Sequence, residues 1–394
     1  MIQPTNILIS GGWGYGNLGD DAILLSTIKL TRSKFPNAKL HIFSYSPNET
    51  KDIILDSNCE LHSSVHRLLF GKSAFRFLRT YKKSIDMPYT IQRISNRIKH
   101  YLPHHVLKPD FKALKELEYL FAETDIFIMS GGGYFNNWRE SLISRCTELR
   151  LAQRFNVTSF IIGQTLDDFQ PIYRDQVKSL LSKCKGVSVR DTDSFNMLKK
   201  MGIASTIAPD LALAGIDVKP SPHPENEIVF IPAELPIHNT NSIIQGIADF
   251  AITNGLIIRI AITRLYNADV RCARKTLRAF RNQGVKAVLE IPNNFNDVAK
   301  HIIGAKFVIS RNLHGLILGY IGGANVLSLH NGWKFIGFLN QINAADSMIN
   351  IENDNITEIA NKLNAAYTYN LSNEIRVELM NIVTKNFNSL VSLS

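Results

Sequence analysis

The chain has 394 residues, of which 45% are hydrophobic, and its 44 Lys and Arg residues against 34 acidic residues give a net charge of +10. This length predicts two domains with enough apolar surface to build a core in each. The four cysteines are far apart and form no Cys-x-x-Cys pair, which argues against a zinc site and against a disulfide framework.

We expect a cytoplasmic protein, because this cysteine usage fits a reducing compartment. We expect no signal peptide, since no basic region precedes an apolar core and the first apolar run breaks at Gly11. No apolar run in the sequence approaches the length that spans a bilayer. Association with the inner face of a membrane stays open.

The first expected strand, residues 6–10, runs into a glycine-rich turn and then a helix that begins near Asp20. Glycines allow a tight turn and the close approach of a ligand, but their spacing is not that of a dinucleotide-binding loop and no P-loop Lys-Ser/Thr pair follows. Asp20 and Asp21 at the helix start favour a polar, hydroxyl-bearing ligand over a bare phosphate. The alternative is that both acids only cap the helix.

Short apolar runs alternate with helical patterns through the first half, which indicates a parallel sheet of βαβ units. The expected strands are residues 6–10, 40–43, 126–129, 159–162, 186–189 and 204–207. Ligands of such sheets collect at the carboxyl ends of the strands. Those ends are expected at residues 11–21, 130–137 and 163–168 and at Arg190-Asp191.

A basic segment interrupts this alternation between residues 61 and 105. Residues 60–110 hold ten Lys and Arg residues against three acidic ones. Residues 65–79 mix apolar and basic residues at helical spacing, which suits an anionic membrane surface, so peripheral membrane contact through residues 65–100 is one interpretation. A solvated face or an insertion that covers the domain is the other. No nucleic-acid-binding motif is apparent, so we expect no nucleic acid partner.

Residues 130–137 are expected to form a second glycine-rich turn, ahead of a helix over residues 139–156. Two such turns in one sheet predict a cleft lined by backbone and short polar side chains. Arg190 follows a later strand, and Asp191 or Thr192 is expected to cap the helix behind it. An arginine there can hold a carboxylate or phosphate with two hydrogen bonds. The alternative is a surface ion pair between Arg190 and Asp191.

A proline-rich polar stretch at residues 216–226 predicts a linker. It separates a first domain, residues 1–215 with a basic insertion at about 61–110, from a second domain at residues 227–371 and a final helix at 372–394. The expected strands of the second domain are residues 227–231, 256–262, 287–290, 307–310 and 326–329.

Arg311 and His314 stand three residues apart at the start of a helix expected over residues 316–323, so both can face the same cleft. A lone histidine is usually structural, but a histidine beside an arginine at a strand end suits acid–base chemistry. Lys334 follows the next strand and adds a cation.

Taken together, these segments resemble the polysaccharide pyruvyl transferase family. The resemblance rests on an ordered set of motifs: Gly16-Asn17-Leu18-Gly19-Asp20-Asp21, Ser130-Gly131-Gly132-Gly133, Gly163-Gln164, Val189-Arg190-Asp191 with Ser194, Pro209-Asp210, Ser310 to Gly315, and Lys334. It implies an α/β fold of two Rossmann-like domains that face one another across a cleft, as in GT-B glycosyltransferases. It also implies transfer of pyruvate from phosphoenolpyruvate onto two hydroxyls of one sugar, which forms a cyclic ketal. The family usually has Arg-x-His before the small-residue helix, and here Asn312 stands where that arginine belongs.

The resemblance implies roles for the polar residues, with no cofactor besides the co-substrate phosphoenolpyruvate. His314 is the expected proton carrier, and Asp20 is expected to orient or deprotonate an acceptor hydroxyl. Because phosphoenolpyruvate is a small trianion, its expected site is Arg190, Arg311, Asn312 and Lys334. The residues expected to bind the acceptor are Gly16, Asn17, Asp21, Gly132, Gly133, Asn136 and Gln164. No metal-ligand cluster is apparent in the sequence, so no metal is expected.

Two other functions fit the same architecture. One is a GT-B glycosyltransferase that uses a nucleotide sugar, although no acidic residue stands in a clear ribose-binding context. The other is a catalytically silent protein that binds sugar. The acceptor is expected to be a lipid-linked or nucleotide-linked saccharide, and homo-oligomerisation is left open.

Overall fold

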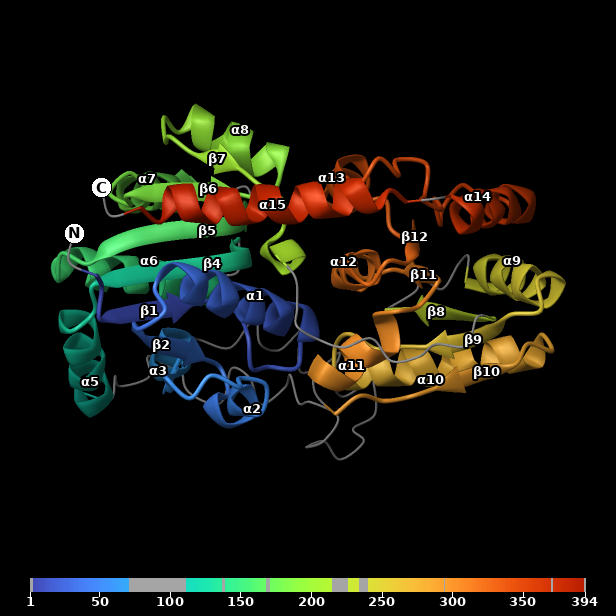
Figure 1. The fold of residues 1–394 in the computed structure, drawn as a ribbon, viewed down its shortest axis with the longest axis horizontal. Coiled ribbons are helices and arrows are strands. Elements are labelled where there is room, and N and C mark those ends of the chain that lie inside the picture. Colours follow the sequence, from blue (N-terminus) through green and yellow to red (C-terminus); the bar gives the residue numbers. More distant parts are fainter. Residues whose placement is uncertain are drawn as a thin grey trace.

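The structure is a computed structural model that describes residues 3–70, 111–136, 139–167, 171–214, 226–233, 240–293, 295–369 and 371–392. The expected linker, apart from Asn226, and most of the basic insertion lie outside these residues, as does Asn137. Within the described ranges the chain forms two parallel sheets side by side (Figure 1). This is the α/β architecture of two Rossmann-like domains.

The first sheet has seven parallel strands in the order β3-β2-β1-β4-β5-β6-β7. Their bounds are β1 (Asn6–Ser10), β2 (Lys39–Ser44), β3 (Cys59–Ser63), β4 (Ile126–Phe135), β5 (Thr158–Leu166), β6 (Gly186–Val189) and β7 (Thr206–Ile207). The helices of this half are α1 (Leu18–Lys34), α2 (Pro47–Lys51), α3 (Val65–Phe70), α5 (Phe111–Ala122), α6 (Arg139–Arg154), α7 (Pro171–Leu181) and α8 (Thr192–Lys200), followed by the 3₁₀ turn η2 (Leu211–Ala214).

The second sheet has five parallel strands in the order β10-β9-β8-β11-β12. Their bounds are β8 (Glu227–Ile231), β9 (Ile257–Ile260), β10 (Ala287–Leu289), β11 (Phe307–Ser310) and β12 (Asn325–Ser328). The helices of this half are α9 (Thr240–Thr253), α10 (Asn267–Asn282), α11 (Phe295–Ile302), α12 (Leu313–Ile321), α13 (Trp333–Gln341), α14 (Ile356–Thr368) and α15 (Asn373–Leu390).

Each sheet buries both faces, as parallel sheets must, so side chains that alternate along a strand enter different cores. On β1, Leu8 packs with helices α5 to α8, whereas Ile7 and Ile9 pack with α1. On β8, Phe230 packs with α9, α10 and α14. The core that contains Ile7 and Ile9 continues without a break into the second domain, where it contains residues of β8, β11, α12 and α13.

The final helix α15 returns from the second domain to pack on the first (Figure 1). Its Leu390 lies against Gly186 at the start of β6, where a Cβ on the glycine would be 2.7 Å from the leucine Cγ. Near the same end, Asn386 Nδ2 donates to Thr206 Oγ1 at 2.9 Å and Lys34 Nζ donates to the carbonyl of Asn388 at 2.5 Å. The helix therefore ties the two domains together at one side.

Most of the expected strands occur within a residue or two of their predicted bounds, but three expectations are wrong. Residues 130–136 are not a turn, because β4 runs on through Gly131 to Gly133 with an irregular register to Phe135. The helix expected at residues 316–323 begins earlier, at Leu313. The alternation of strands and helices is also not broken at residue 61, because β3 spans this position and pairs in parallel with β2.

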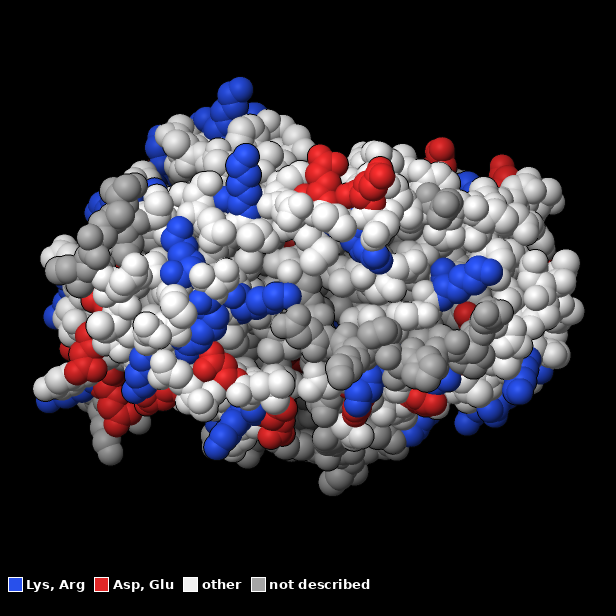
Figure 2. Space-filling model, viewed as in Figure 1, with Lys and Arg blue, Asp and Glu red and all other residues white. Residues whose placement is uncertain are grey.

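The surface carries charges of both signs. In Figure 2, Lys and Arg side chains are scattered over both domains rather than gathered in one patch on the face shown. Among the described residues, none of the helices combines the length and the apolar character needed to cross a membrane.

Candidate active site

Each of the two sheets has one topological switch point. In the first sheet the order reverses between β1 and β4, and in the second it reverses between β8 and β11. Ligands of open α/β sheets bind beyond the carboxyl ends of the strands at such points. The segments that follow β1 and β11, Gly11–Asp20 and Arg311–His314, meet there across the domain interface.

His314 of the second domain lies against the start of α1 in the first. A Cβ added to Gly19 would be 2.1 Å from Cγ and Nδ1 of the His314 ring, so only glycine leaves room for the imidazole. Burial lowers the pKa of His314 below its usual range, and the nearby Arg190 and Lys334 lower it further, whereas Asp210 and Asp20 act to raise it. The imidazole is therefore neutral at pH 7 and stands among two cations and two carboxylates.

Asp20 is buried and accepts hydrogen bonds from three side chains of its own domain. Tyr15 Oη donates at 2.5 Å and Asn17 Nδ2 at 2.6 Å to one carboxylate oxygen, and Tyr134 Oη donates at 3.0 Å to the other. Burial raises the pKa of Asp20, while His314 and the two tyrosine hydrogen bonds act in the opposite direction. Asp20 is therefore a fixed, oriented carboxylate beside the imidazole.

Asp21 is also buried but faces the preceding loop. Its Oδ1 accepts from the backbone nitrogen of Gly14 at 3.3 Å. Burial raises the pKa of Asp21 to about 7, the Gly14 hydrogen bond lowers it, and Asp20 and Glu49 raise it. The N-cap position of α1 is Asn17, and both acids stand in the first turn of the helix.

Arg190 is held at the site by the first domain. Its Nη1 forms an ion pair with Asp210, and its Nε donates to Thr165 Oγ1 at 2.9 Å. Neither of these contacts is with Asp191, the partner in the alternative ion pair. Asp191 instead caps α8 by accepting from the Ser194 nitrogen at 2.7 Å, as expected, and accepts from Thr165 at 2.9 Å.

Lys334 reaches the first domain from the start of α13. Its Nζ lies 3.5 Å from the position that a Cβ on Gly133 would occupy. Burial lowers the pKa of Lys334, Arg190 lowers it further, and Asp167 and Asp191 act to raise it. Every one of these charged neighbours belongs to the first domain, so Lys334 and His314 both cross the interface.

The other two residues predicted to bind the donor are Arg311 and Asn312. Asn312 caps α12, where its Oδ1 accepts from the Gly315 nitrogen at 3.3 Å. The backbone nitrogen of Arg311 donates to the carbonyl of Ile231 at 3.0 Å. Burial lowers the pKa of His330, and the nearby Arg311 guanidinium lowers it further. Their predicted roles in donor binding stay predictions.

Two of the residues predicted for the acceptor join the domains through the backbone. The Gly16 carbonyl accepts from the Leu265 nitrogen at 2.8 Å, and Asn17 pairs with Arg264 in an antiparallel bridge. The next residue continues this contact, because the Leu18 nitrogen donates to the Thr263 carbonyl at 2.9 Å. Tyr15 also stacks on Tyr266, with ring centroids 6.4 Å apart.

The other predicted acceptor residues lie along the last part of β4 or bond to it. Gly132 has φ of +122° and, like Gly12, leaves no room for a Cβ beside the Tyr134 ring. Asn136 Nδ2 donates to the Gly133 carbonyl at 2.6 Å, and the buried Gln164 donates from Nε2 to the Ser130 carbonyl at 2.5 Å. Gly12 and Gly132 therefore leave the space in which the Tyr134 ring lies when its hydroxyl donates to Asp20.

A fully buried ion pair on α6 contacts the end of β1 and the segment that follows it. Arg145 Nη1 and Glu148 Oε2 are 2.8 Å apart on α6. Arg145 Nη2 donates to the Gly11 carbonyl at 3.0 Å, and the guanidinium lies 5.2 Å from the centre of the Tyr134 ring. Ser10 Oγ donates to Glu148 at 2.7 Å. The pair thus fixes the backbone where β1 ends.

Three buried polar atoms of the predicted site have no hydrogen-bond partner among the described residues: Asn17 Oδ1, Gln164 Oε1 and His314 Nε2. Buried polar groups in folded proteins are almost always paired, so unpaired ones need a reason, such as a ligand. Arg190 and Lys334 offer two cations to an anion, whereas the two amide oxygens can accept hydrogen bonds from hydroxyl groups.

The sequence missed several residues of this arrangement. Tyr15, Tyr134 and Asp210 contact predicted site residues, and Arg145 with Glu148 lies beneath them. Asp210 carried a signal, since it belongs to the motif Pro209-Asp210. Tyr15 and Tyr134 also lie in segments expected at strand ends, residues 11–21 and 130–137, whereas nothing in the sequence distinguishes the α6 pair from ordinary helix residues.

The fold is similar to that of nucleotide-sugar enzymes at very low sequence identity. A transferase from Siraitia grosvenorii in complex with UDP is 8% identical over 99% of this chain and 96% of its own, with a TM-score of 0.52. The protein HepE from Anabaena in complex with UDP-glucose is 10% identical over 98% of both chains, with a TM-score of 0.55. The UDP-GlcNAc 2-epimerase from Neisseria meningitidis is 11% identical over 98% of this chain and 100% of its own, with a TM-score of 0.57. These similarities show a GT-B-like fold and no more.

Comparison of the sequence with curated proteins gives no match. A family model described as polysaccharide pyruvyl transferase, by contrast, matches residues 17–331, which is most of the chain. The matched region includes Asp20, Arg190, Asp210 and His314, and it ends just before Lys334. The chain belongs to the polysaccharide pyruvyl transferase family.

Proposed function

We propose that this protein transfers pyruvate from phosphoenolpyruvate onto two hydroxyls of one sugar in a glycan precursor and so forms a cyclic ketal. The observation that carries the proposal is the convergence of Arg190, Lys334 and His314 from two domains onto one place. Family membership supports a role in polysaccharide pyruvylation. The identity of the donor, the formation of a ketal and the identity of the acceptor are the parts that we propose.

The two cations supply the donor site. Phosphoenolpyruvate carries a phosphate and a carboxylate, which require positive charge and hydrogen-bond donors at a short separation. Arg190 has its Nη1 paired with Asp210 and its Nε with Thr165, so it is oriented before the ligand arrives. Lys334 has its pKa lowered by burial and by Arg190, and an anion between the two cations would relieve that repulsion.

His314 is the proposed proton carrier. It is neutral in the free protein because burial lowers its pKa. An anionic donor beside it favours the imidazolium, so binding of phosphoenolpyruvate would load the acid that the first step needs. The unpaired Nε2 is the atom we assign to this proton.

Asp20 is the proposed partner of the acceptor. Hydrogen bonds from Tyr15, Asn17 and Tyr134 fix its carboxylate, and burial raises its pKa toward the range in which a carboxylate can accept a proton. A sugar hydroxyl at this carboxylate would be oriented and made more nucleophilic. The neighbouring polar groups, Asn17 and Gln164, supply buried amide oxygens to a hydroxyl-rich ligand.

The proposed reaction balances in atoms and charge. A proton adds to the methylene carbon of phosphoenolpyruvate, and one sugar hydroxyl attacks the neighbouring carbon and loses its proton. The C–O bond to phosphate then breaks, and the second hydroxyl attacks the same carbon and closes the ring. Of the two hydroxyl protons, one replaces the proton added to carbon and the other leaves with the phosphate. The product is a pyruvate ketal and hydrogen phosphate.

Phosphate release tests the proposal. Wild-type protein is incubated with phosphoenolpyruvate and a panel of lipid-linked and nucleotide-linked sugars, and inorganic phosphate and the mass of the glycan are measured. We expect acceptor-dependent release, a mass increase for one pyruvyl group, and a loss of at least about 100-fold in rate for His314→Gln. The matched control is His301→Gln, a histidine paired with Glu290 at 2.7 Å in the second domain, which should keep full rate. Full activity of His314→Gln would remove that residue from the mechanism.

A thermal-shift comparison separates this function from glycosyl transfer. Stabilisation by phosphoenolpyruvate supports the proposal, because only a ligand that binds the folded state raises its stability. Stabilisation by nucleotide sugars alone would favour the GT-B glycosyltransferase alternative. Binding of sugar without any turnover across the panel would favour a silent sugar-binding protein.

A further inference from the structure

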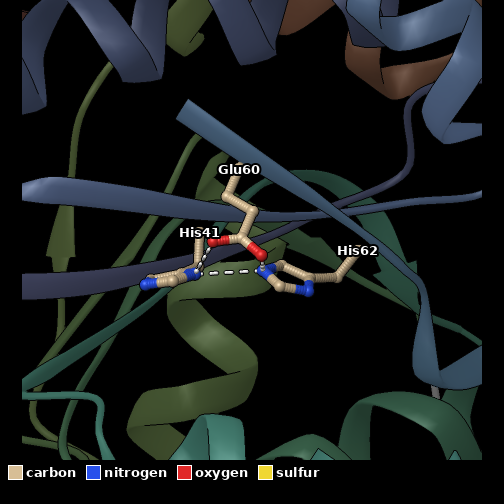
Figure 3. A group of neighbouring side chains, drawn as sticks. All are labelled: His41, Glu60 and His62. Atoms are coloured by element: carbon tan, nitrogen blue, oxygen red, sulfur yellow. Dashed lines mark hydrogen bonds and ion pairs between the residues drawn. The ribbon is translucent and has the colours of Figure 1, made fainter. Parts of the chain in front are cut away.

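Two histidines and a glutamate meet on one face of the first sheet, at its β2–β3 edge and within strands rather than beyond their ends. His41 of β2 is in register with Glu60 of β3, and His62 follows two residues later on the same face of β3. Figure 3 shows the two imidazoles and the carboxylate turned toward one another. No metal-ligand cluster is apparent in the sequence, because these residues come together only through strand pairing.

The three side chains have the geometry of a metal-ligand set. His41 Nδ1 and His62 Nε2 are 3.0 Å apart. Glu60 Oε2 lies 3.7 Å from His41 Nδ1, and Glu60 Oε1 lies 3.9 Å from His62 Nε2. Ligands at about 2.1 Å from a tetrahedral metal ion lie about 3.4 Å from each other, a separation that these distances bracket. One ligand atom from each of the three residues lies within 4.8 Å of the others, so the three can bind the same ion.

The surroundings of His41 set its tautomer. Its other ring nitrogen, Nε2, lies 3.3 Å from Asn6 Oδ1, and a carbonyl oxygen can only accept. With its proton on Nε2, His41 presents a lone pair at Nδ1, toward His62 and Glu60. Such a hydrogen bond from the far nitrogen to an oxygen is the usual support of a metal-binding histidine.

One group competes for the carboxylate. Lys39 Nζ forms an ion pair with Glu60 Oε2 at 2.6 Å, and both side chains are about half exposed. Exposed pairs of this kind contribute little stability. The second oxygen, Oε1, faces His62 and is the one that a metal ion would use without breaking the pair.

We propose that His41, Glu60 and His62 form a binding site for a divalent transition-metal ion such as Zn²⁺, with solvent completing the coordination. Two imidazole nitrogens and one carboxylate suit Zn²⁺, Co²⁺, Ni²⁺ or Cu²⁺ and are unsuitable for Mg²⁺ or Ca²⁺, which prefer oxygen. The ion would join the edge strand β3 to β2. It takes no part in the proposed pyruvyl transfer.

The test is direct metal binding by the full chain. The protein is treated with a chelator, desalted and titrated with ZnCl₂ by calorimetry, and with CoCl₂ while the visible absorption of Co²⁺ is recorded. We expect one ion per chain, absorption typical of tetrahedral Co²⁺ with nitrogen ligands, and no binding of MgCl₂. His62→Gln and Glu60→Gln should each weaken Zn²⁺ binding by at least about tenfold, and Asn6→Ala by about tenfold through His41.

The control is His301→Gln, which removes a histidine paired with Glu290 outside the cluster and should bind Zn²⁺ as the wild type does. Glu60 is half exposed at a sheet edge, so Glu60→Gln carries the test even if the His62 variant does not fold. Circular dichroism confirms folding of each variant. Failure of the wild type to bind Zn²⁺ with one-to-one stoichiometry, or equal affinity in wild type and Glu60→Gln, would overturn the proposal.

Discussion

At the scale of single residues, two buried acids lie in the first turn of α1. Asp20 and Asp21 are adjacent, yet their environments differ, because Asp20 receives three side-chain hydrogen bonds and Asp21 one backbone nitrogen. Burial raises the pKa of both carboxyl groups. Burying a carboxyl group lowers the stability of the fold, and such groups with shifted pKa values are common in functional sites.

The pKa of Asp21, about 7, predicts how stability changes with pH. In the unfolded chain an aspartate has a pKa of about 3.9, so the protonated form stabilises the fold, fully below about pH 4 and progressively less as the pH rises to about 7. Asp21→Asn should therefore be more stable than the wild type by an amount on the order of 3 kcal/mol at pH 8. The advantage should shrink steadily toward pH 5 in urea unfolding. An advantage that stays constant over this range would contradict the assignment.

At the scale of elements, the contact between α1 and α12 places the imidazole. Gly19, the last glycine of the segment that follows β1, is inside α1, and a Cβ there would overlap the His314 ring. This glycine is needed for the close approach of another chain segment rather than for a backbone angle. Asn312 begins α12 as its cap and so fixes the turn from which His314 projects.

Gly19→Ala should displace the His314 ring. Because a shift of about 1 Å at a reacting group can cost about 100-fold in rate, we expect acceptor-dependent phosphate release to fall by about that factor. The matched control is Gly337→Ala on α13, where a Cβ would meet nothing within 4 Å and activity should be kept. Equal rates for the two variants would show that the contact at Gly19 does not matter for turnover.

The same elements show how far the sequence predicts the molecule. Strands such as β1 and β8 contain uninterrupted apolar runs, Ile7 to Ile9 and Ile228 to Ile231, and the sequence alone predicts their bounds. Gly131 to Gly133 look like a turn by composition, but they lie in the central strand β4, which pairs with β5 through Gly132 and Gln164, and a Cβ on Gly132 would overlap the Tyr134 ring. Strand pairing and side-chain packing of this kind depend on residues far away in the chain, so no local pattern reveals them.

At the scale of the whole molecule, one hydrophobic core runs through both domains, and polar residues meet above it. Arg190 and Lys334 were predicted from their places after strands, and the structure puts each within the electrostatic reach of the other. Asp210, by contrast, became part of the site through its ion pair with Arg190, which the sequence did not predict. The two domains thus each supply a cation, and the second adds the imidazole.

Titration of phosphoenolpyruvate into the protein, followed by calorimetry without any acceptor, tests this arrangement most directly. We predict one binding site, an affinity at least about tenfold weaker in Lys334→Gln, and proton uptake on binding that is lost in His314→Gln. Absence of saturable binding, or an affinity that is the same in wild type and Lys334→Gln, would contradict the donor site at the domain interface.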